Sequence, residues 1–177
     1  MKSVMVSIKP EYCSLIVDTK KTVEVRKTKP KLDTPFKCYI YCTKSAIMDL
    51  VIKNGKSFTF QKIPTHVKDQ MHESYVANGY IIGEFICDRI HEFQVFENGS
   101  VQDWWLGDLD KACLQYNEVA EYVGKGKKGY GWKISNLIVY DSPKELSNFT
   151  SHCNQFKQLT RPPQSWCYVE ELTVSKP

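Results

Sequence analysis

The sequence predicts one α+β domain over residues 1–177, arranged as a small, partly open β-barrel of five to seven strands with two or three flanking helices. Runs of alternating apolar and polar residues, typical of strands, come first, and a mixed helix–strand tail follows. No internal repeat, linker or low-complexity segment divides the chain. Hydrophobic residues make up 42% of the chain, which is enough for one core.

The N-terminal part contains three predicted strands and one short helix. Residues 3–9 alternate in polarity and form the first strand. Pro10 suits the first turn of a helix, and this helix is expected to end near Thr19. Residues 22–27 and 36–43 then alternate again, which predicts two further strands separated by a turn-rich loop.

The middle of the chain contains a predicted insertion and then a long strand. Residues 44–78 show no clear periodicity and are expected to form a polar, poorly packed and partly helical insertion. Residues 79–96 predict one long strand that bends near Arg89. Gly83 within this strand indicates a bulge or a close approach of another backbone. A helix is expected over residues 108–124.

The C-terminal part is predicted to contain two strands. One strand includes Trp132 and continues toward a turn at Pro143, after which a short helix is expected to reach Phe149. A rigid corner at Pro162 and Pro163 precedes the last strand.

The composition indicates a protein of a reducing compartment, and we expect a cytoplasmic location. Seven cysteines are an odd, dispersed set, which does not fit a secreted disulfide framework. The sequence has no apolar run long enough to span a membrane and no N-terminal signal peptide pattern.

We expect neither a metal site nor a cofactor. Cys38 and Cys42 are four residues apart in a predicted strand, so they lie roughly 13 Å apart. Zinc–sulfur bonds are about 2.3 Å long, so the two thiols cannot bind one zinc ion. Because Phe36 and Ile40 share their face of the strand, both cysteines are expected to be buried and reduced.

The positive charge is concentrated near the N-terminus. Residues 1–44 contain ten Lys and Arg against four Asp and Glu, a net charge of +6. The rest of the chain contains fourteen against sixteen, a net charge of −2. Such a local excess suits a polyanionic partner such as RNA, but a solvated lysine-rich face would produce the same count.

The most informative stretch surrounds Glu24 and Arg26. Strand alternation places these two side chains on one face, with Lys21 just before the strand. We expect Val23 and Val25 to point to the interior, which leaves the charged face for a ligand. Arginine can bind phosphate or carboxylate through two parallel hydrogen bonds. The alternative is an exposed ion pair worth about 0–1 kcal/mol.

The pattern K-x-x-E-x-R resembles the signature of the ASCH domain, usually written G-x-K-x-x-E-x-R. The matching residues are Lys21, Glu24 and Arg26, while Thr19 stands at the glycine position. The order of the helix, the signature strand and a later W-x-I strand that begins at Trp132 also resembles this family. The closing segment, LTRPPQSWCYVEE, is similar to the tails of small phage and Gram-positive bacterial ASCH proteins.

The resemblance implies a PUA-like barrel with a cleft beside the signature helix, and recognition of RNA or a nucleotide. Some small relatives hydrolyse N4-acetylcytidine with a Lys and a Thr of this signature and a Glu from a later helix. Lys21 matches that Lys, but Glu24 stands at the Thr position. Glu118 and Glu121 are both candidates for the later Glu. The carboxylate at Glu24 predicts that this chain lacks the amidohydrolase activity.

Further ligand-binding candidates come from basic and aromatic residues elsewhere. Lys27, Tyr41, Tyr130 and Arg161 are predicted to join Lys21, Glu24 and Arg26 in the site, with Tyr39 as another stacking candidate. Trp132 is expected to be a core residue. The alternative for the corner that carries Arg161 is a purely structural role, without contact to a ligand.

Three functions therefore stay open. The first is a module that binds nucleic acid or a modified nucleotide. The second is a hydrolase, of an amidohydrolase or ribonuclease type, with Lys21 as base or nucleophile and Glu24 as its acid–base partner. The third is a protein–protein adaptor that uses residues 44–78 and the pair Trp104 and Trp105. The sequence does not predict an oligomeric state.

Overall fold

The computed structural model describes residues 1–68, 71, 73–102, 110–153 and 157–172. Its helices are α1 (Pro10–Val17), α2 (Thr65–Lys68) and α3 (Tyr116–Val123), with 3-10 turns at Asp110–Ala112 and Leu146–Asn148. Its strands are β1 (Lys2–Ile8), β2 (Val23–Arg26), β3 (Phe36–Cys42), β4 (Met48–Lys53), β5 (Lys56–Gln61), β6 (Ser74–Val76), β7 (Ile81–Val95), β8 (Val101–Gln102), β9 (Lys128–Lys144) and β10 (Trp166–Glu170).

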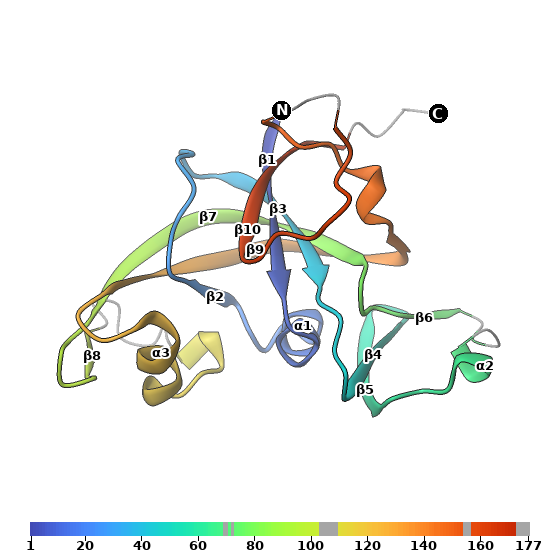
Figure 1. Cartoon of the computed structure of the whole chain (residues 1–177), viewed down its shortest axis with the longest axis horizontal. Coiled ribbons are helices and arrows are strands. Elements are labelled where there is room, and N and C mark those ends of the chain that lie inside the picture. Colours follow the sequence, from blue (N-terminus) through green and yellow to red (C-terminus); the bar gives the residue numbers. More distant parts are fainter. Residues whose placement is uncertain (69–70, 72, 103–109, 154–156, 173–177) are drawn as a thin grey trace.

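A seven-stranded sheet forms the centre of the molecule, in the order β10-β1-β3-β7-β9-β2, with β8 paired to β7 (Figure 1). Only the β1–β3 pair is parallel among the pairings of this sheet in the described residues. A second sheet has the order β5-β4-β6. The predicted α+β class is thus confirmed. The predicted barrel is not closed in the described part of the chain, because the strand path ends at β10 and β2.

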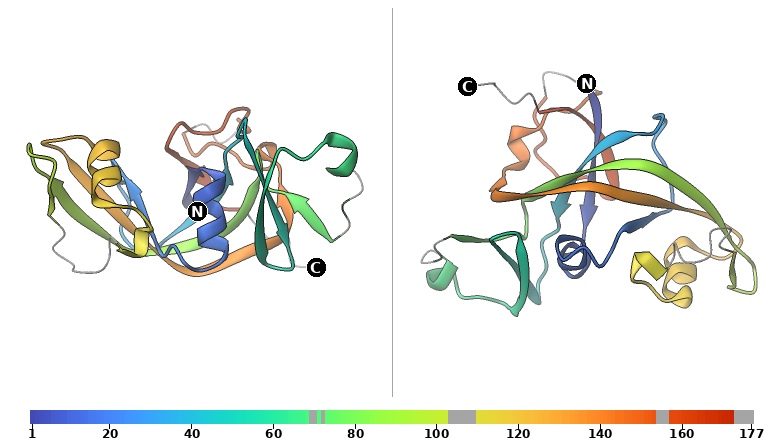
Figure 2. Two further views of the ribbon diagram at one scale, coloured as in Figure 1. Left: turned by 90° about the horizontal axis from the view of Figure 1, so that it is seen from below. Right: turned by 180° about the vertical axis from the view of Figure 1, so that it is seen from behind.

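The long strands β7 and β9 curve together across the molecule (Figure 2). Helix α1 lies below the middle of the large sheet in Figure 1, with α3 and the small sheet toward opposite ends. Gly83 of β7 confirms the expected close approach, since a Cβ atom there would collide with the Ile138 carbonyl oxygen of β9. The pairing register of β7 and β9 also shifts at this glycine and again before Ile90.

The main core lies between α1, the large sheet and the small sheet. Cys38, Cys42 and Trp132 are fully buried in it, which confirms the expected burial of all three. All seven cysteines are free thiols. No helix in the described residues is long and apolar enough to cross a membrane.

The prediction that Tyr41 offers a stacking surface is wrong. Tyr39 and Tyr41 are buried in a separate cluster with Met5 and Phe149. Strand β3 lies inside the large sheet, and the segment around Phe149 covers its second face. Alternation correctly separated the two faces of this strand, but both faces are covered.

The segment 44–78 packs better than its sequence suggests. Its strands β4, β5 and β6 form the second sheet, and Leu50, Ile52 and Ala77 enter the main core. The prediction of a poorly packed insertion is therefore wrong for its inner face. Of the predicted helix 108–124, the structure describes residues 110–124, and within these only Tyr116–Val123 is α-helical. Trp104 and Trp105 lie outside the described residues.

Candidate functional site

The turn between α1 and β2 directs Lys21 inward. Thr19, at the glycine position of the signature, has φ of 59°, in the left-handed region that glycine adopts most readily. The amides of Lys20 and Lys21 both donate to the carbonyl of Leu15, which closes the end of the helix. This compact turn places Lys21 immediately before the strand that carries Glu24.

Lys21 is 2% exposed. Its Nζ atom donates to the Ala112 carbonyl oxygen at 2.6 Å and lies 3.4 Å from Oε2 of Glu24. It also lies 5.3 Å from the centre of the Tyr12 ring, where a cation–π interaction is favourable. Lys21 is therefore held by a carbonyl, a carboxylate and an aromatic face.

Glu24 and Arg26 form a buried ion pair, so the interpretation of an exposed pair is wrong. The Nη2 atom of Arg26 lies 2.7 Å from Oε1 of Glu24, and each side chain is less than a tenth exposed. In the pairing of β2 with β9, Glu24 is directly opposite the buried Trp132. Cross-strand partners share a face, so the charged pair points to the side of the main core.

The expectation that Val23 and Val25 point to the main core is therefore corrected. They pack in a second cluster with Val119 and Val123 of α3. Helix α3 covers the face of β2 that sequence reasoning had assigned to the barrel interior. Because both faces of this strand are covered, the charged residues lie in a sheltered pocket.

Arg26 has more donor capacity than its protein partners use. Its Nη2 atom donates to the Ser7 carbonyl oxygen at 2.6 Å, and its Nη1 atom makes a long contact of 3.4 Å to Ser165 Oγ. Its buried Nε atom has no hydrogen-bond partner among the described residues. With Lys21 and Glu24, the group has a formal net charge of +1.

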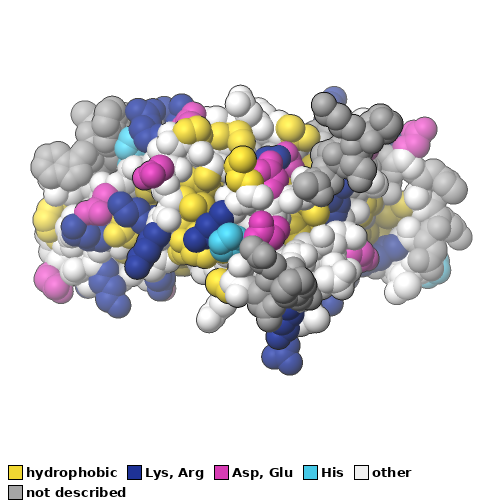
Figure 3. All heavy atoms as spheres, turned by 90° about the horizontal axis from the view of Figure 1, so that it is seen from above, with side chains coloured by type: hydrophobic (Ala, Val, Ile, Leu, Met, Phe, Trp, Pro, Cys, Tyr) yellow, Lys and Arg dark blue, Asp and Glu magenta, His cyan; other side chains and the backbone are white. Residues whose placement is uncertain are grey.

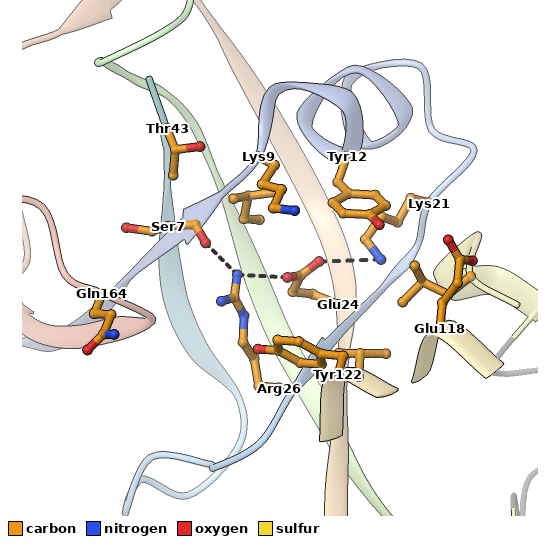
Figure 4. A pocket seen from close by; sticks show the side chains of 13 residues that line it. Ser7, Lys9, Tyr12, Lys21, Glu24, Arg26, Thr43, Glu118, Tyr122 and Gln164 are labelled. Atoms are coloured by element: carbon orange, nitrogen blue, oxygen red, sulfur yellow. Dashed lines mark hydrogen bonds and ion pairs between the residues drawn. The ribbon is translucent and has the colours of Figure 1, made fainter. Parts of the chain in front are cut away.

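These three residues lie at a cavity of about 450 Å³ (Figure 4). Figure 4 shows Tyr12 on α1 and Tyr122 and Glu118 on α3, with the ion-paired group between the two helices. The other side is formed by strand ends and by the loop before β10. The cavity is lined by Ser7, Ile8, Lys9, Tyr12, Lys21, Glu24, Val25, Arg26, Thr43, Leu114, Glu118, Tyr122 and Gln164.

Tyr12 provides a neutral hydroxyl group in this cavity. Burial raises the pKa of Tyr12 above its ordinary value, and the nearby carboxylates of Glu118, Glu11 and Glu24 raise it further. The phenol therefore keeps its proton at neutral pH and can donate a hydrogen bond to a ligand.

The remaining predicted site residues have different locations. Lys27 is exposed and stacks its Nζ atom 5.1 Å above the ring centre of Tyr122, so it lies near the rim. Tyr130 is half-buried and directly opposite Arg26 on β9, but it is not among the lining residues. Arg161 is exposed and also outside the lining set, whereas Gln164 from the same corner is part of it.

Sequence reasoning missed several lining residues. Tyr12 was not among the predicted site residues, although its proximity to the signature in the sequence was a usable signal. Ser7 comes from β1, Thr43 directly follows β3 and Tyr122 comes from α3, and the three share no sequence pattern. The structure also distinguishes the two candidate glutamates, since Glu118 lines the cavity and Glu121 does not.

The charge outside the cavity is mixed. On the face shown in Figure 3, lysine and arginine side chains are interspersed with acidic ones. Several N-terminal lysines also have acidic partners, such as Lys37 with Glu84 and Glu171 at 3.0 and 2.9 Å. The positive excess of residues 1–44 is thus partly neutralised within the fold. Among the described residues, no group of three or more His, Cys, Asp or Glu could hold a metal ion.

No protein-family model and no curated protein matches the sequence. Solved structures do match. The ASCH protein of Zymomonas mobilis shares 18% identity over 96% of this chain and 88% of that chain, with a TM-score of 0.59. A Tyr-to-Phe variant of it shares 19% identity over 97% and 92%, and a Ser-to-Ala variant 18% over 96% and 89%, both with TM-scores of 0.59. Likeness at this level of identity shows a shared fold.

Proposed function

We propose that this protein, which has an ASCH-type, PUA-like fold, binds a nucleotide in the cavity lined by Lys21, Glu24 and Arg26. The nucleotide is either free or one unit of an RNA strand. The observation that carries this proposal is the convergence of three buried charged side chains on one cavity next to two tyrosines.

The charge of the cavity supports an anionic or strongly hydrogen-bond-accepting ligand. Two cations share one carboxylate, and Arg26 has unused donors. A guanidinium matches the geometry of phosphate oxygens and of paired acceptors on a base. A ligand oxygen at Arg26 would use this excess positive charge.

The aromatic walls support a planar group. Tyr12 and Tyr122 lie on two different helices on opposite sides of the cavity (Figure 4). Stacking of a base on an aromatic side chain is worth about 1–3 kcal/mol and does not depend strongly on which base is bound. The hydroxyl groups of both tyrosines add hydrogen bonds at the ring edge.

The size of the cavity supports a single nucleotide unit. Small-molecule sites have volumes of about 300–1,000 Å³, and this cavity of about 450 Å³ falls within that range. A duplex is too wide for it. An RNA strand would insert one nucleotide and pass its neighbours over the rim near Lys27 and Lys9.

Binding is a better-supported role than hydrolysis. Hydrolysis needs a nucleophile or activated water in contact with an available base. Lys21 is engaged by Ala112 and Glu24, and Glu24 in turn is engaged by both cations. The hydroxyl of Ser7 donates to the Pro163 carbonyl oxygen at 2.6 Å, so it is engaged as well.

Isothermal titration calorimetry with the four ribonucleoside 5′-monophosphates and with a short single-stranded RNA tests the proposal. We expect binding that is lost or strongly weakened in Lys21→Ala and retained in Arg161→Ala, which removes an exposed arginine outside the cavity. Absence of binding for every probe, or equal binding by Lys21→Ala, would refute the proposal. Chromatography of the recovered probe reports whether it has been hydrolysed, which would favour the enzyme alternative.

A further inference from the structure

The outer face of the small sheet carries an apolar groove that the nucleotide site does not use. Its volume is about 420 Å³. Among its lining residues are the apolar side chains of Val51, Phe58, Phe60, Ile63, Val67 and Met71.

Strand periodicity explains why this face is apolar. Phe58 and Phe60 are two residues apart on β5, so they point to the same side, and Val51 of β4 is directly opposite Phe58. Phe58 is 47% exposed, Phe60 48% and Val67 41%. Large aromatic side chains that are half exposed next to one another on a strand mark an interaction surface rather than scattered surface residues.

The segment along one side of the groove is held to the small sheet by a buried carboxylate. Asp49 of β4 is fully buried and accepts hydrogen bonds from Lys62 at 2.7 Å and from the backbone amide of Ile63 at 2.9 Å. Lys68 of α2 forms a further ion pair with it at 2.8 Å. These bonds tie the segment that carries Ile63 and Val67 to the sheet, so the groove is part of the folded structure.

One end of the groove carries uncompensated positive charge. Lys53 and Lys56 are directly opposite one another at the hairpin end of β4 and β5, and both are exposed. Neither has an acidic partner in the part of the chain that the structure describes. Like charges directly opposite in a sheet destabilise it, and a negative group from outside would relieve that repulsion.

We propose that this groove binds a short segment of another protein, in which a large apolar side chain is followed by acidic residues. The apolar side chain occupies the groove between Phe58, Phe60 and Val67, and the acidic residues pair with Lys53 and Lys56. The charge complementarity at the hairpin end selects this kind of partner. A concave groove suits a protruding side chain better than a flat lipid surface. This proposal does not depend on the nucleotide binding proposed for the other cavity.

A display library of random short peptides, selected on the folded full chain, tests the proposal. We expect the enriched peptides to combine a Phe, Trp, Leu or Met with neighbouring Asp or Glu. Binding of the best synthetic peptide, followed by fluorescence anisotropy, should weaken at least about tenfold in Phe60→Ser and in Val67→Ser. The double variant Lys53→Glu, Lys56→Glu should also weaken it and reverse its dependence on salt, because the acidic peptide is then repelled and salt screens that repulsion.

Ile47→Ser is the matched control, because Ile47 belongs to the same segment and is 80% exposed but does not line the groove. It should bind the peptide like the wild type. Thermal denaturation confirms that each variant is folded. No enrichment above a blank surface, or equal peptide binding by Phe60→Ser and the wild type, would overturn the proposal. So would groove-dependent binding to anionic vesicles, or concentration-dependent dimers abolished by Phe60→Ser.

Discussion

The guanidinium of Arg26 and the carboxylate of Glu24 lie 2.7 Å apart in a buried position at the candidate site. Lys21 approaches the other oxygen of the same carboxylate at 3.4 Å. One carboxylate thus compensates two buried cations, and the arrangement depends on Glu24 more than on either cation.

Glu24→Gln is expected to destabilise the fold by about 3–5 kcal/mol, because it leaves both Lys21 and Arg26 without a buried counter-charge. Urea denaturation followed by circular dichroism measures this change. Glu92→Gln is the control, since Glu92 pairs with Lys128 at an exposed position and should change the stability by about 0–1 kcal/mol. Equal stabilities of Glu24→Gln and the wild type would show that the buried pair is not required.

Arg26→Lys should fold but bind nucleotides weakly. A lysine can replace one of the contacts to Glu24 and Ser7, but it lacks the fork of donors that matches phosphate. A hydrogen bond to a charged group contributes about 1.5–3 kcal/mol, so the affinity should fall about ten- to a hundredfold. Calorimetry with the tightest-binding monophosphate measures this fall. An unchanged affinity would place the ligand away from Arg26.

Salt should distinguish a single nucleotide from a strand. If a single-stranded RNA contacts four phosphates, the slope of log affinity against log salt is expected to be about −3. A mononucleotide has no condensed counterions to release, so its affinity should depend on salt much more weakly than that of the strand. Anisotropy measurements over a range of salt concentrations give both dependences. A flat dependence for the RNA would show that the positive charge of residues 1–44 does not contact its backbone.

Asp49 is expected to make stability depend on acid pH. Burial opposes its ionisation, but the hydrogen bonds from Lys62, Lys68 and the Ile63 amide outweigh burial and lower the pKa of Asp49 to about 2. A carboxyl group with a lowered folded-state pKa stabilises the fold above its unfolded pKa of about 3.9, and this contribution disappears as the pH falls toward 2.

Asp49→Asn should therefore destabilise the protein by about 2 kcal/mol at pH 7. The difference from the wild type should shrink progressively between about pH 5 and pH 2. Urea denaturation at a series of pH values provides the comparison. A difference that stays constant over this range would mean that the ion pairs of Asp49 do not contribute through its charge.

The protein is expected not to deacetylate N4-acetylcytidine. In the hydrolases that its signature resembles, a threonine stands at the position of Glu24, and a carboxylate held between Lys21 and Arg26 cannot replace that hydroxyl. Chromatography of N4-acetylcytidine after incubation with the wild type and with Lys21→Ala tests this. Turnover by the wild type that is lost in Lys21→Ala would favour the hydrolase over the binding module as the function of this protein.

The alternation of residues along the chain was sufficient to predict which side chains of β2 share a face. A period of two along residues 22–27 places Glu24 and Arg26 on one face and Val23 and Val25 on the other, whatever the rest of the chain does. The burial of Cys38 and Cys42 followed in the same way from the apolar residues Phe36 and Ile40 on their face of the strand. The close approach of the β9 backbone to β7 could also be predicted from the single residue Gly83.

The sequence by itself thus determined the α+β class, the strand faces and the three charged residues of the site. Only the tertiary structure decided which faces are covered: α3 packs on the valines of β2, and the segment around Phe149 buries Tyr41. It also brought Tyr12, Thr43, Tyr122 and Gln164 to one cavity. Side-chain periodicity is a property of neighbours in the chain, whereas burial depends on elements distant in sequence, whose packing no local pattern encodes.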